Sequence, residues 1–561
     1  RLSLVGSEMC IRDRCRESFH NWQVNAVGHT VQWGYNRVSG VPTSETDPNG
    51  VTTTATYDVF GRLTSIVRNG DSSTTPTLSA VYDDAARPFK VQLQQRITGS
   101  TYYTLRKYYD GMGRLIQTQT VGARIGSSNR DIYSDTYFDA YGQVIRQSVP
   151  YDLATGGGYR TRDTSKPATY ATYDVLGRQR RTTFTDGAYT ENTYLDLETK
   201  VRDPRGYTTR YIKDAWGRTT QARPPIAPYV TYTYDILDRL ATAVYGTAQT
   251  TISYDFAGRK TQMSDADMGL WKYAYDGAGN LTRQTDARNK RVCFYYDAIN
   301  RLVGKHYRSD DNCPASPTYN IRYYYDAGTN GKGRRTSMSD PSGSTSWIYD
   351  ARGRVTQETK TVTGSGTFIT QWGYNSADLA AWIKYPGGSS SQIGEQVTYA
   401  YHPQMLLNTA TGSTTYLAQT DYDAAGRVEL RKLGNSASSP TLQSDYVYFP
   451  WNTVNGMGRL KQIMTGTPAS PTSLQDLRYY TGTGTPAYDA AGNITSIDDY
   501  KAASPQTQAF TYDNSGRLAS ATASGTRGLN GAYLLENYVY DSAGRLSNNA
   551  GVVLSLSLIH I

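Results

Sequence analysis

The chain has 561 residues, of which 38% are hydrophobic, but 49 residues are tyrosines, so few aliphatic side chains remain for a conventional core. A composition rich in Tyr, Thr and Gly is typical of an all-β protein packed through aromatic side chains, and it excludes a helical bundle, a coiled coil and a doubly wound α/β enzyme. The net charge of +9 comes mostly from arginines interleaved with acidic residues, which argues against a nucleic-acid partner. No apolar run approaches the ~18 residues of a membrane span.

The two ends of the chain carry a shared signal. Residues 4–14 and 556–561 can be encoded by the two strands of one DNA element, which resembles a transposon adapter used in sequencing libraries. We therefore expect four segments: translated adapter at residues 1–14, a degenerate repeat at 15–46, the repeat array at 47–549, and the fragment's end at 550–561, with adapter at 556–561. On this interpretation the chain is an internal piece of a longer reading frame.

Between the ends the chain repeats one unit, Tyr-Asp-x-x-Gly-Arg followed by Leu or Val. In the densest stretch the motif aspartates are 20 or 21 residues apart, and a second turn signal, such as Asp203-Pro204-Arg205-Gly206, lies about halfway. Each period therefore predicts two turns and two short strands, which is a β-hairpin. Five copies represent the motif: Tyr57, Asp58, Gly61 and Arg62; Tyr109, Asp110, Gly113 and Arg114; Tyr254, Asp255, Gly258 and Arg259; Tyr422, Asp423, Gly426 and Arg427; Tyr512, Asp513, Gly516 and Arg517.

The chemistry of the motif is that of a turn. An Asp at the first position accepts a hydrogen bond from the backbone N–H two residues on, and a Gly three places later takes the left-handed conformation of a type I turn with a bulge. Alternation in the strands predicts rows of tyrosines on the sheet faces, and the motif Arg is expected to lie on a ring or to pair with a neighbouring Asp.

The repeated motif resembles the RHS repeat, also called the YD repeat, of bacterial polymorphic toxins, wall-associated proteins, insecticidal toxin complexes and teneurins. The resemblance implies a β-sheet that spirals into a hollow shell, which in the toxins encloses a C-terminal effector. The family's block that closes the shell, Arg-x-Tyr-Asp-Pro-x-x-Gly, has no match here. Self-cleavage and toxicity therefore transfer to no residue of this chain, and no catalytic residue, cofactor or metal ligand is expected.

Cys293 and Cys313 are one repeat period apart. Their spacing leaves three interpretations open: a local disulfide between neighbouring strands of a secreted protein, two free thiols, or a metal site. Cys15 lies beside the adapter segment and carries no interpretation.

Other residues with chemical potential fit no catalytic pattern. The histidines His20, His29, His306 and His402 lack a ligand-spaced partner. The acidic turn at 264–269 lacks the closing Glu of a calcium loop, which favours turn capping. Carbohydrate binding on exposed aromatic side chains is a possible partner interaction, for which the candidates are Trp33, Trp216, Trp271, Trp347, Trp372, Trp382 and Trp451.

The leading hypothesis is a structural, non-enzymatic shell segment of a large secreted or cell-surface bacterial protein, whose partner is a tethered C-terminal effector outside this fragment. The alternative is a wall-associated adhesion module that binds carbohydrate.

Overall fold

The computed structural model describes residues 21–310, 312–500, 506–524, 536–541, 544–549 and 552–553. Every regular element among them is a β-strand, and successive strands pair antiparallel. Forty-five strands form one sheet, and β40 and β41 form a separate pair. The predicted all-β fold class is therefore confirmed. No helix in the described part of the chain is long and apolar enough to cross a membrane.

The first coil, residues 21–310, contains 26 strands. They are β1 (Trp22–Val24), β2 (Thr30–Tyr35), β3 (Pro42–Thr46), β4 (Thr52–Tyr57), β5 (Leu63–Val67), β6 (Leu78–Asp83), β7 (Phe89–Thr98), β8 (Thr101–Tyr109), β9 (Leu115–Ile125), β10 (Ser128–Phe138), β11 (Val144–Ser148), β12 (Tyr151–Ala154), β13 (Ala168–Tyr173), β14 (Gln179–Thr183), β15 (Tyr189–Leu195), β16 (Glu198–Arg202), β17 (Thr208–Lys213), β18 (Thr219–Arg223), β19 (Val230–Tyr234), β20 (Leu240–Tyr245), β21 (Ala248–Tyr254), β22 (Lys260–Asp265), β23 (Gly269–Tyr275), β24 (Leu281–Thr285), β25 (Arg291–Tyr296) and β26 (Leu302–Arg308).

The second coil, from residue 312 onward, contains the remaining strands. They are β27 (Ile321–Tyr325), β28 (Arg335–Asp340), β29 (Gly343–Tyr349), β30 (Val355–Val362), β31 (Gly366–Tyr374), β32 (Ala380–Pro386), β33 (Ile393–Tyr401), β34 (Leu407–Thr411), β35 (Thr415–Tyr422), β36 (Val428–Leu433), β37 (Leu442–Tyr448), β38 (Leu460–Thr467), β39 (Ser470–Arg478), β40 (Tyr480–Thr481), β41 (Thr485–Pro486), β42 (Ser496–Asp499), β43 (Gln506–Tyr512), β44 (Leu518–Ser524), β45 (Glu536–Tyr540), β46 (Leu546–Asn549) and β47 (Val552–Val553).

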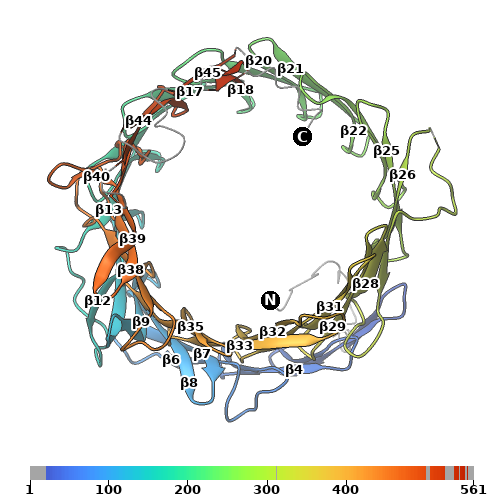
Figure 1. The fold of residues 1–561 in the computed structure, drawn as a ribbon, viewed down its shortest axis with the longest axis horizontal. Coiled ribbons are helices and arrows are strands. Elements are labelled where there is room, and N and C mark those ends of the chain that lie inside the picture. The colour runs from blue at the N-terminus through green and yellow to red at the C-terminus, as the bar shows by residue number, and fades with distance from the viewer. Residues whose placement is uncertain are drawn as a thin grey trace.

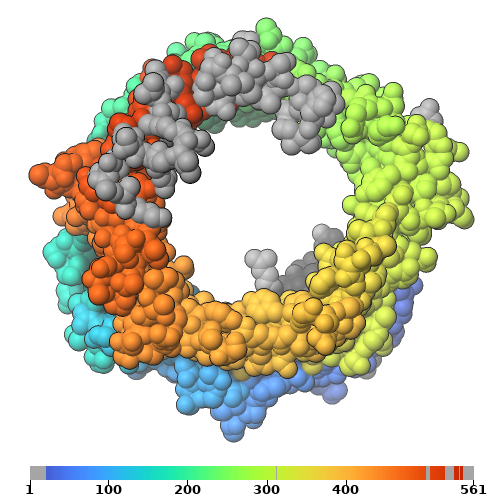
Figure 2. All heavy atoms as spheres, viewed as in Figure 1, coloured from blue at the N-terminus to red at the C-terminus, as the bar shows by residue number. Residues whose placement is uncertain are grey.

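The meander winds around an axis, so that the second coil runs alongside the first and the sheet forms a ring (Figure 1). Hydrogen bonds between the coils join residues 266–310 positions apart in sequence. The space-filling view shows an open lumen surrounded by this wall (Figure 2).

The turns of the meander fall on two edges of the ribbon. The motif turns, such as Asp58–Gly61, lie on one edge, which we call the motif edge. The turns halfway between them, such as Asp47–Gly50, lie on the opposite edge, which we call the intervening edge. Because consecutive turns of an antiparallel meander alternate in this way, every copy of the motif is presented on the same edge.

Two parts of the first coil differ in construction. The regular wall, β14 to β25, is a single layer of strands five to seven residues long. The branch region, β7 to β13 with the loop 155–167, has strands of up to 11 residues, and β10 pairs with β9, β11 and β12. Many of the most buried side chains lie here, among them Ile97, Tyr108, Ala123 and Tyr133.

Candidate functional site

Each motif Asp closes its own turn. Asp58 Oδ1 accepts the backbone N–H groups of Phe60 at 3.0 Å and Arg62 at 2.9 Å, and Asp58 Oδ2 accepts Arg62 Nε–H at 2.7 Å. Gly61 has a φ of +75°, and the strand register slips by one residue beside Tyr57. This is the turn with a bulge that the sequence predicts. The same bonds join Asp110 to Arg114, Asp255 to Arg259, Asp423 to Arg427 and Asp513 to Arg517.

These bonds also set the charge state of the turn. Partial desolvation raises the pKa of the Asp58 carboxyl, but the hydrogen bonds from the backbone and guanidinium of Arg62 outweigh it and hold that pKa below its ordinary value. The pKa of Asp235 is lowered in the same way by Arg239. The carboxylates of Asp58 and Asp235 are therefore bound as anions within their own turns.

Neighbouring repeats are joined through the motif Tyr and Arg. The Tyr254 hydroxyl donates to the carbonyl of Leu240 at 2.9 Å, while the Arg239 guanidinium stacks 4.7 Å from the Tyr254 ring centroid and donates to the carbonyl of Asp255 at 2.8 Å. One repeat thus supplies the cation and the next supplies the ring. The same step joins Arg62 to Tyr82, Arg218 to Tyr234, Arg259 to Tyr275, Arg301 to Tyr325, Arg354 to Tyr374, Arg427 to Tyr448 and Arg517 to Tyr540.

The other motif tyrosines also donate their hydroxyl to a carbonyl of the preceding repeat, and Tyr57 and Tyr109 are the two exceptions. The hydroxyls of Tyr422 and Tyr512 donate to the carbonyls of Leu407 and Ile494 at 2.8 Å. Tyr109 packs its ring 5.7 Å from that of Phe89, and burial raises the pKa of the Tyr57 hydroxyl. The predicted contact of Arg with a neighbouring Asp also occurs, for example at 2.8 Å between Arg62 and Asp84.

The two coils meet along a seam in which the motif edge of the second coil lies on the intervening edge of the first. Its most buried anchor is Asp71, whose side chain is 0% exposed. Asp71 accepts hydrogen bonds from Arg352 at 2.7 Å, Arg96 at 2.7 Å and Ser376 at 2.8 Å. Desolvation raises the pKa of Asp71, but its hydrogen bonds with Thr77, Ser376 and Arg352 lower it below its ordinary value. The seam is therefore held by a buried charge with full partners.

Further polar contacts continue the seam around the ring. Gln404 bonds both the N–H and the carbonyl of Arg124, and Thr185 donates to the carbonyl of Trp451 at 2.6 Å. Arg205 donates to the carbonyl of Asp513 at 3.1 Å, and Arg545 pairs with Asp267.

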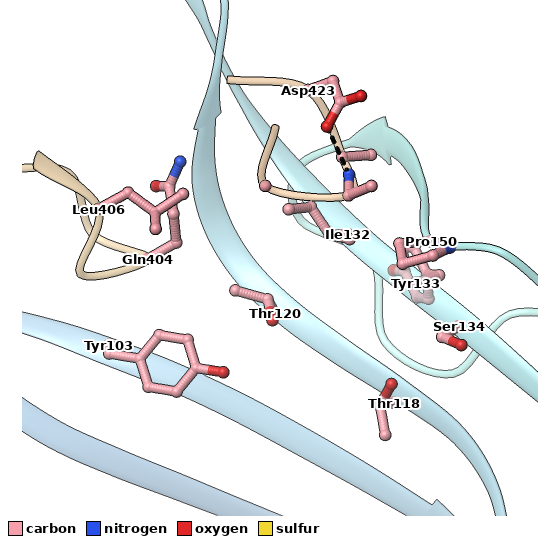
Figure 3. A pocket seen from close by; sticks show the side chains of 13 residues that line it. Tyr103, Thr118, Thr120, Ile132, Tyr133, Ser134, Pro150, Gln404, Leu406 and Asp423 are labelled. Atoms are coloured by element: carbon pink, nitrogen blue, oxygen red, sulfur yellow. Dashed lines mark hydrogen bonds between the residues drawn. The ribbon is translucent and has the colours of Figure 1, made fainter. Parts of the chain in front are cut away.

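A cleft of about 280 Å³ opens at the seam beside the branch region. Figure 3 shows Thr118 and Thr120 of β9 on one side of it, and Gln404 and Asp423 of the second coil on the other. Asp423 is bonded to the backbone of its own turn and to Arg427. The Asp423 carboxylate is therefore engaged within its own turn and is not a free acid or base of the cleft.

The branch region holds a buried polar network in place of an apolar core. Asp135, which is 0% exposed, accepts hydrogen bonds from Gln117 Nε2–H at 2.7 Å, the Tyr151 hydroxyl at 2.8 Å and the Asp163 N–H at 3.2 Å. Asp131, equally buried, accepts from Gln119 Nε2–H at 2.9 Å. These groups fasten the loop 155–167 across β8 to β10.

The two cysteines are joined in the structure by a disulfide with a Cα–Cα distance of 5.8 Å. Cys293 lies fully buried in β25, but Cys313 lies in the loop after β26 and not on a neighbouring strand. The difference arises because the connection from β26 to β27 is longer than a repeat turn. Among the described residues, no cluster of three or more His, Cys, Asp or Glu side chains has the arrangement of a metal site.

The other candidate residues have structural contacts. Of the seven candidate tryptophans, Trp216 is 77% exposed at a turn tip, whereas Trp271 and Trp347 donate their indole N–H to Met268 and Glu358. Asp265 caps its turn by accepting the N–H groups of Asp267 and Met268. His29 lies 3.2 Å from Asp326 across the seam, His402 bonds the carbonyl of Thr420, and His306 bonds that of Thr318. His20 and Cys15 lie outside the described residues.

Sequence reasoning missed the seam and the branch region. The seam joins residues nearly 300 positions apart, and no local pattern marks them. The branch region did carry a signal, because the motif is sparse between Arg114 and Tyr173.

This architecture defines a class of protein. It is a hollow β-shell of tandem hairpins, in which the Arg of one repeat stacks on the Tyr of the next. Two stretches, residues 39–74 and 330–367, match the model of the RHS Repeat, and the chain is an RHS/YD-repeat protein. Residues 84–197, which include the whole branch region, match a domain of unknown function, DUF6443.

The chain is also similar to longer proteins. It is 24% identical over 479 residues to Double-stranded DNA deaminase toxin A of Burkholderia cenocepacia (strain H111), and the match covers 79% of this chain and 29% of that protein. The crystal structure of TcdB2-TccC3-Cdc42 superposes with a TM-score of 0.76 at 16% identity, over 93% of this chain and 34% of that one. A Tc holotoxin pore structure of Photorhabdus luminescens gives a TM-score of 0.73 at 16% identity, over 92% and 34%. The chain thus spans about a third of the length of the proteins it matches.

Proposed function

We propose that this chain is a non-enzymatic wall segment of a shell that encloses and carries a C-terminal toxin effector, as part of a larger secreted or cell-surface bacterial protein. The observation that carries the proposal is the ring-shaped wall around an open lumen, in which a second coil is fastened to the first. A wall of this kind separates a tethered polypeptide from its surroundings.

The assignment of the motif residues supports a structural role. The Asp and Arg side chains of the motif bond to each other within one turn, and the Arg also contacts the next repeat. Their hydrogen-bonding capacity is taken up by the wall, so these residues hold the shell and are not presented to a substrate. The similarity to a protein named as a toxin is consistent with an effector as the partner.

The proposal is tested by recovering the complete reading frame with long-read sequencing across both ends, and then expressing it. We expect a small unrelated domain downstream of the repeats, resistant to added protease in the intact protein. Asp71→Ala removes the buried seam anchor and should expose that domain to cleavage. Asp84→Ala, which removes an exposed partner of Arg62, is the matched control and should leave the protection unchanged.

A wall-binding or anchoring segment downstream in place of an effector would contradict the proposal. It would favour the alternative, an adhesion module that binds carbohydrate, and a glycan array would then be expected to show selective binding. A sealed shell predicts no such binding.

A further inference from the structure

The outer face of the wall can be followed along the strands of the first coil. The loop between β26 and β27 projects outward from the ring at the right of Figure 1. The disulfide joins this loop to Cys293 of β25, and the Tyr295 hydroxyl donates to the carbonyl of Pro314 in the loop at 2.8 Å. Because directly paired residues of neighbouring strands point to the same side of a sheet, the register carries this outer face from Cys293 back to β14.

On β14 to β18 this outer face is strongly basic. It carries two carboxylates, Glu191 and Glu198. Its cations, which we call the basic patch, are Arg180, Arg181, Lys200, Arg202, Arg210 and Arg223. Arg180 belongs to the patch because it lines a cleft of about 340 Å³ together with Arg181 and Glu191. The lumen face of the same five strands carries Lys213 as its one charged side chain, so the charge is concentrated on the side turned away from the lumen.

The cations of the basic patch face each other across the strands. Arg210 of β17 is directly opposite Lys200 of β16 on one side and Arg223 of β18 on the other. Like charges directly opposite each other in a sheet are destabilising. The pKa of the Glu198 carboxyl lies below its ordinary value because Arg210 donates a hydrogen bond to it and because Lys200 and Arg223 lie close. One carboxylate thus has three cations around it, which leaves their charge only partly balanced.

Tyrosine rings lie among these cations. The guanidinium groups of Arg181 and Arg202 lie 4.0 Å and 4.8 Å from the centroid of the Tyr189 ring. The guanidinium of Arg223 lies 5.1 Å from the ring centroid of Tyr229, which is 47% exposed. Tyrosine is enriched at the level of lipid headgroups, because its ring is apolar and its hydroxyl is polar.

The basic patch lies inside the sheet and not at one of its edges. β13 and β19 are hydrogen-bonded to β14 and β18 on either side of it. The second coil meets these strands at their intervening turns, where Thr185 and Arg205 bond to it. It therefore runs beside the outer face (Figure 1), and the side chains of Arg181 and Arg210 are 39% and 44% exposed.

The composition of the patch favours a membrane over a protein as its partner. The centre of a protein interface is depleted of charged residues and holds apolar side chains. Here the positions between the cations are mostly polar, as at Thr193, Thr208 and Gln221, and Ile212 is the aliphatic exception. Lipid headgroups diffuse, so that each cation gains an anion without a fixed complementary surface.

We propose that the basic patch binds the headgroups of anionic phospholipids, so that the outer face of β14 to β18 lies against a membrane surface. The proposal goes beyond the shell function and does not depend on what the lumen encloses. Each Lys or Arg near an anionic bilayer strengthens binding about fivefold. Salt screens these charges, so binding weakens as the ionic strength rises.

The test is co-sedimentation of the full chain with vesicles of phosphatidylcholine, with and without phosphatidylglycerol. We expect binding only when phosphatidylglycerol is present. The patch variant Lys200→Gln, Arg210→Gln and Arg223→Gln should weaken binding about a hundredfold, at about fivefold per cation. It removes facing like charges, so we expect a thermal melt no lower than that of the parent. The charge-conserving variant Lys200→Arg, Arg210→Lys and Arg223→Lys should bind as the parent does.

The matched control removes three cations from the lumen face, in Lys213→Gln, Lys305→Gln and Lys360→Gln, and so changes the net charge equally. It should bind as the parent does. Binding to phosphatidylcholine alone, no binding in the presence of phosphatidylglycerol, a patch variant that binds like the parent, or a lumen variant that loses binding would each overturn the proposal. Equal affinity for a short DNA duplex would also overturn it, because the patch would then not distinguish a membrane from another polyanion.

Discussion

The regular wall and the branch region are made of the same kind of antiparallel strand, but they are stabilised differently. In the regular wall the side chains of β14 to β25 are mostly half-buried, and each motif turn adds a capping Asp and, except at Asn280, a stacked Arg. In the branch region, five polar or aromatic side chains, Gln117, Gln119, Asp131, Tyr133 and Asp135, are at most 1% exposed.

The difference shows two ways to stabilise a sheet that has few aliphatic residues. A repeated wall adds many small terms of about 0.5–1 kcal/mol per stacked cation, so no single side chain decides its stability. In a buried polar network a few groups decide much of the stability. Removing one of them leaves its partners buried without a hydrogen bond, and each such partner carries a desolvation cost. Substitutions should therefore have graded effects in the wall and large effects in the branch region.

The largest effect is expected from Asp135→Ala. It leaves Gln117 Nε2–H, the Tyr151 hydroxyl and the Asp163 N–H without their acceptor in a buried site, at a cost of about 3–5 kcal/mol. Hydrogen exchange should rise first in the loop 155–167. Asp152→Ala, which removes a partly exposed partner of Arg130 in the same region, should cost less than about 1 kcal/mol. Equal effects of the two variants would contradict the network.

The second largest loss of stability is expected when the disulfide at the end of the first coil is broken. Reduction or Cys313→Ser should lower the stability of β25 to β27 by about 3 kcal/mol, because the bond closes a loop of 20 residues in the unfolded chain. Thiol titration of the native and denatured protein gives the redox state directly. Because Cys10 and Cys15 also react when the chain is denatured, the bond predicts two reactive thiols in the unreduced, denatured chain, and four would show that the bond is absent.

The sequence predicted the wall well because its information is local. The hairpin at Asp255–Arg259 follows from five adjacent residues, and the stacking of Arg259 on Tyr275 follows from the period. The seam was not predictable, because Asp71 and Arg352 are brought together only by the curvature of the ring. The branch region was missed because β10 pairs with three strands. The turn signals of a hairpin array predict pairing only between strands that follow each other in sequence.

A smaller effect is expected in the wall from Gly258→Val. Gly258 has a φ of +81°, a conformation that a β-branched residue adopts only with strain of about 1–3 kcal/mol. Gly277→Val in the next motif turn is the matched control, since Gly277 has no positive φ and a Cβ there meets no atom within 4 Å. Thermal melts and protease patterns should differ only for Gly258→Val. If both variants resembled the parent, the assigned turn conformation would be wrong.

Arg239→Gln should have a still smaller effect, about 1 kcal/mol. It removes the ion pair with Asp235 at 2.6 Å and the stacking on Tyr254. Arg288→Gln, whose side chain is 63% exposed and whose Asp286 partner lies in an intervening turn, should change the stability by only a few tenths of a kcal/mol. If Arg239→Gln lowers the stability no more than Arg288→Gln does, the stacking of Arg on Tyr between repeats contributes nothing to the stability.

The smallest effect per residue is the acid sensitivity of the wall. The pKa values of Asp58, Asp174 and Asp235 are lowered in the folded chain, so their contribution is complete above the ordinary value of 3.8 and is lost as the pH falls through the folded pKa. Hydrogen exchange corrected for intrinsic rates should therefore rise below about pH 4 in the motif turns. Asp235→Asn keeps an acceptor for the backbone N–H groups but removes the titration, so its turn should lose the pH dependence while neighbouring turns retain it. Acid exchange that begins in the branch region and leaves the motif turns protected would show that the motif carboxylates do not govern the acid response.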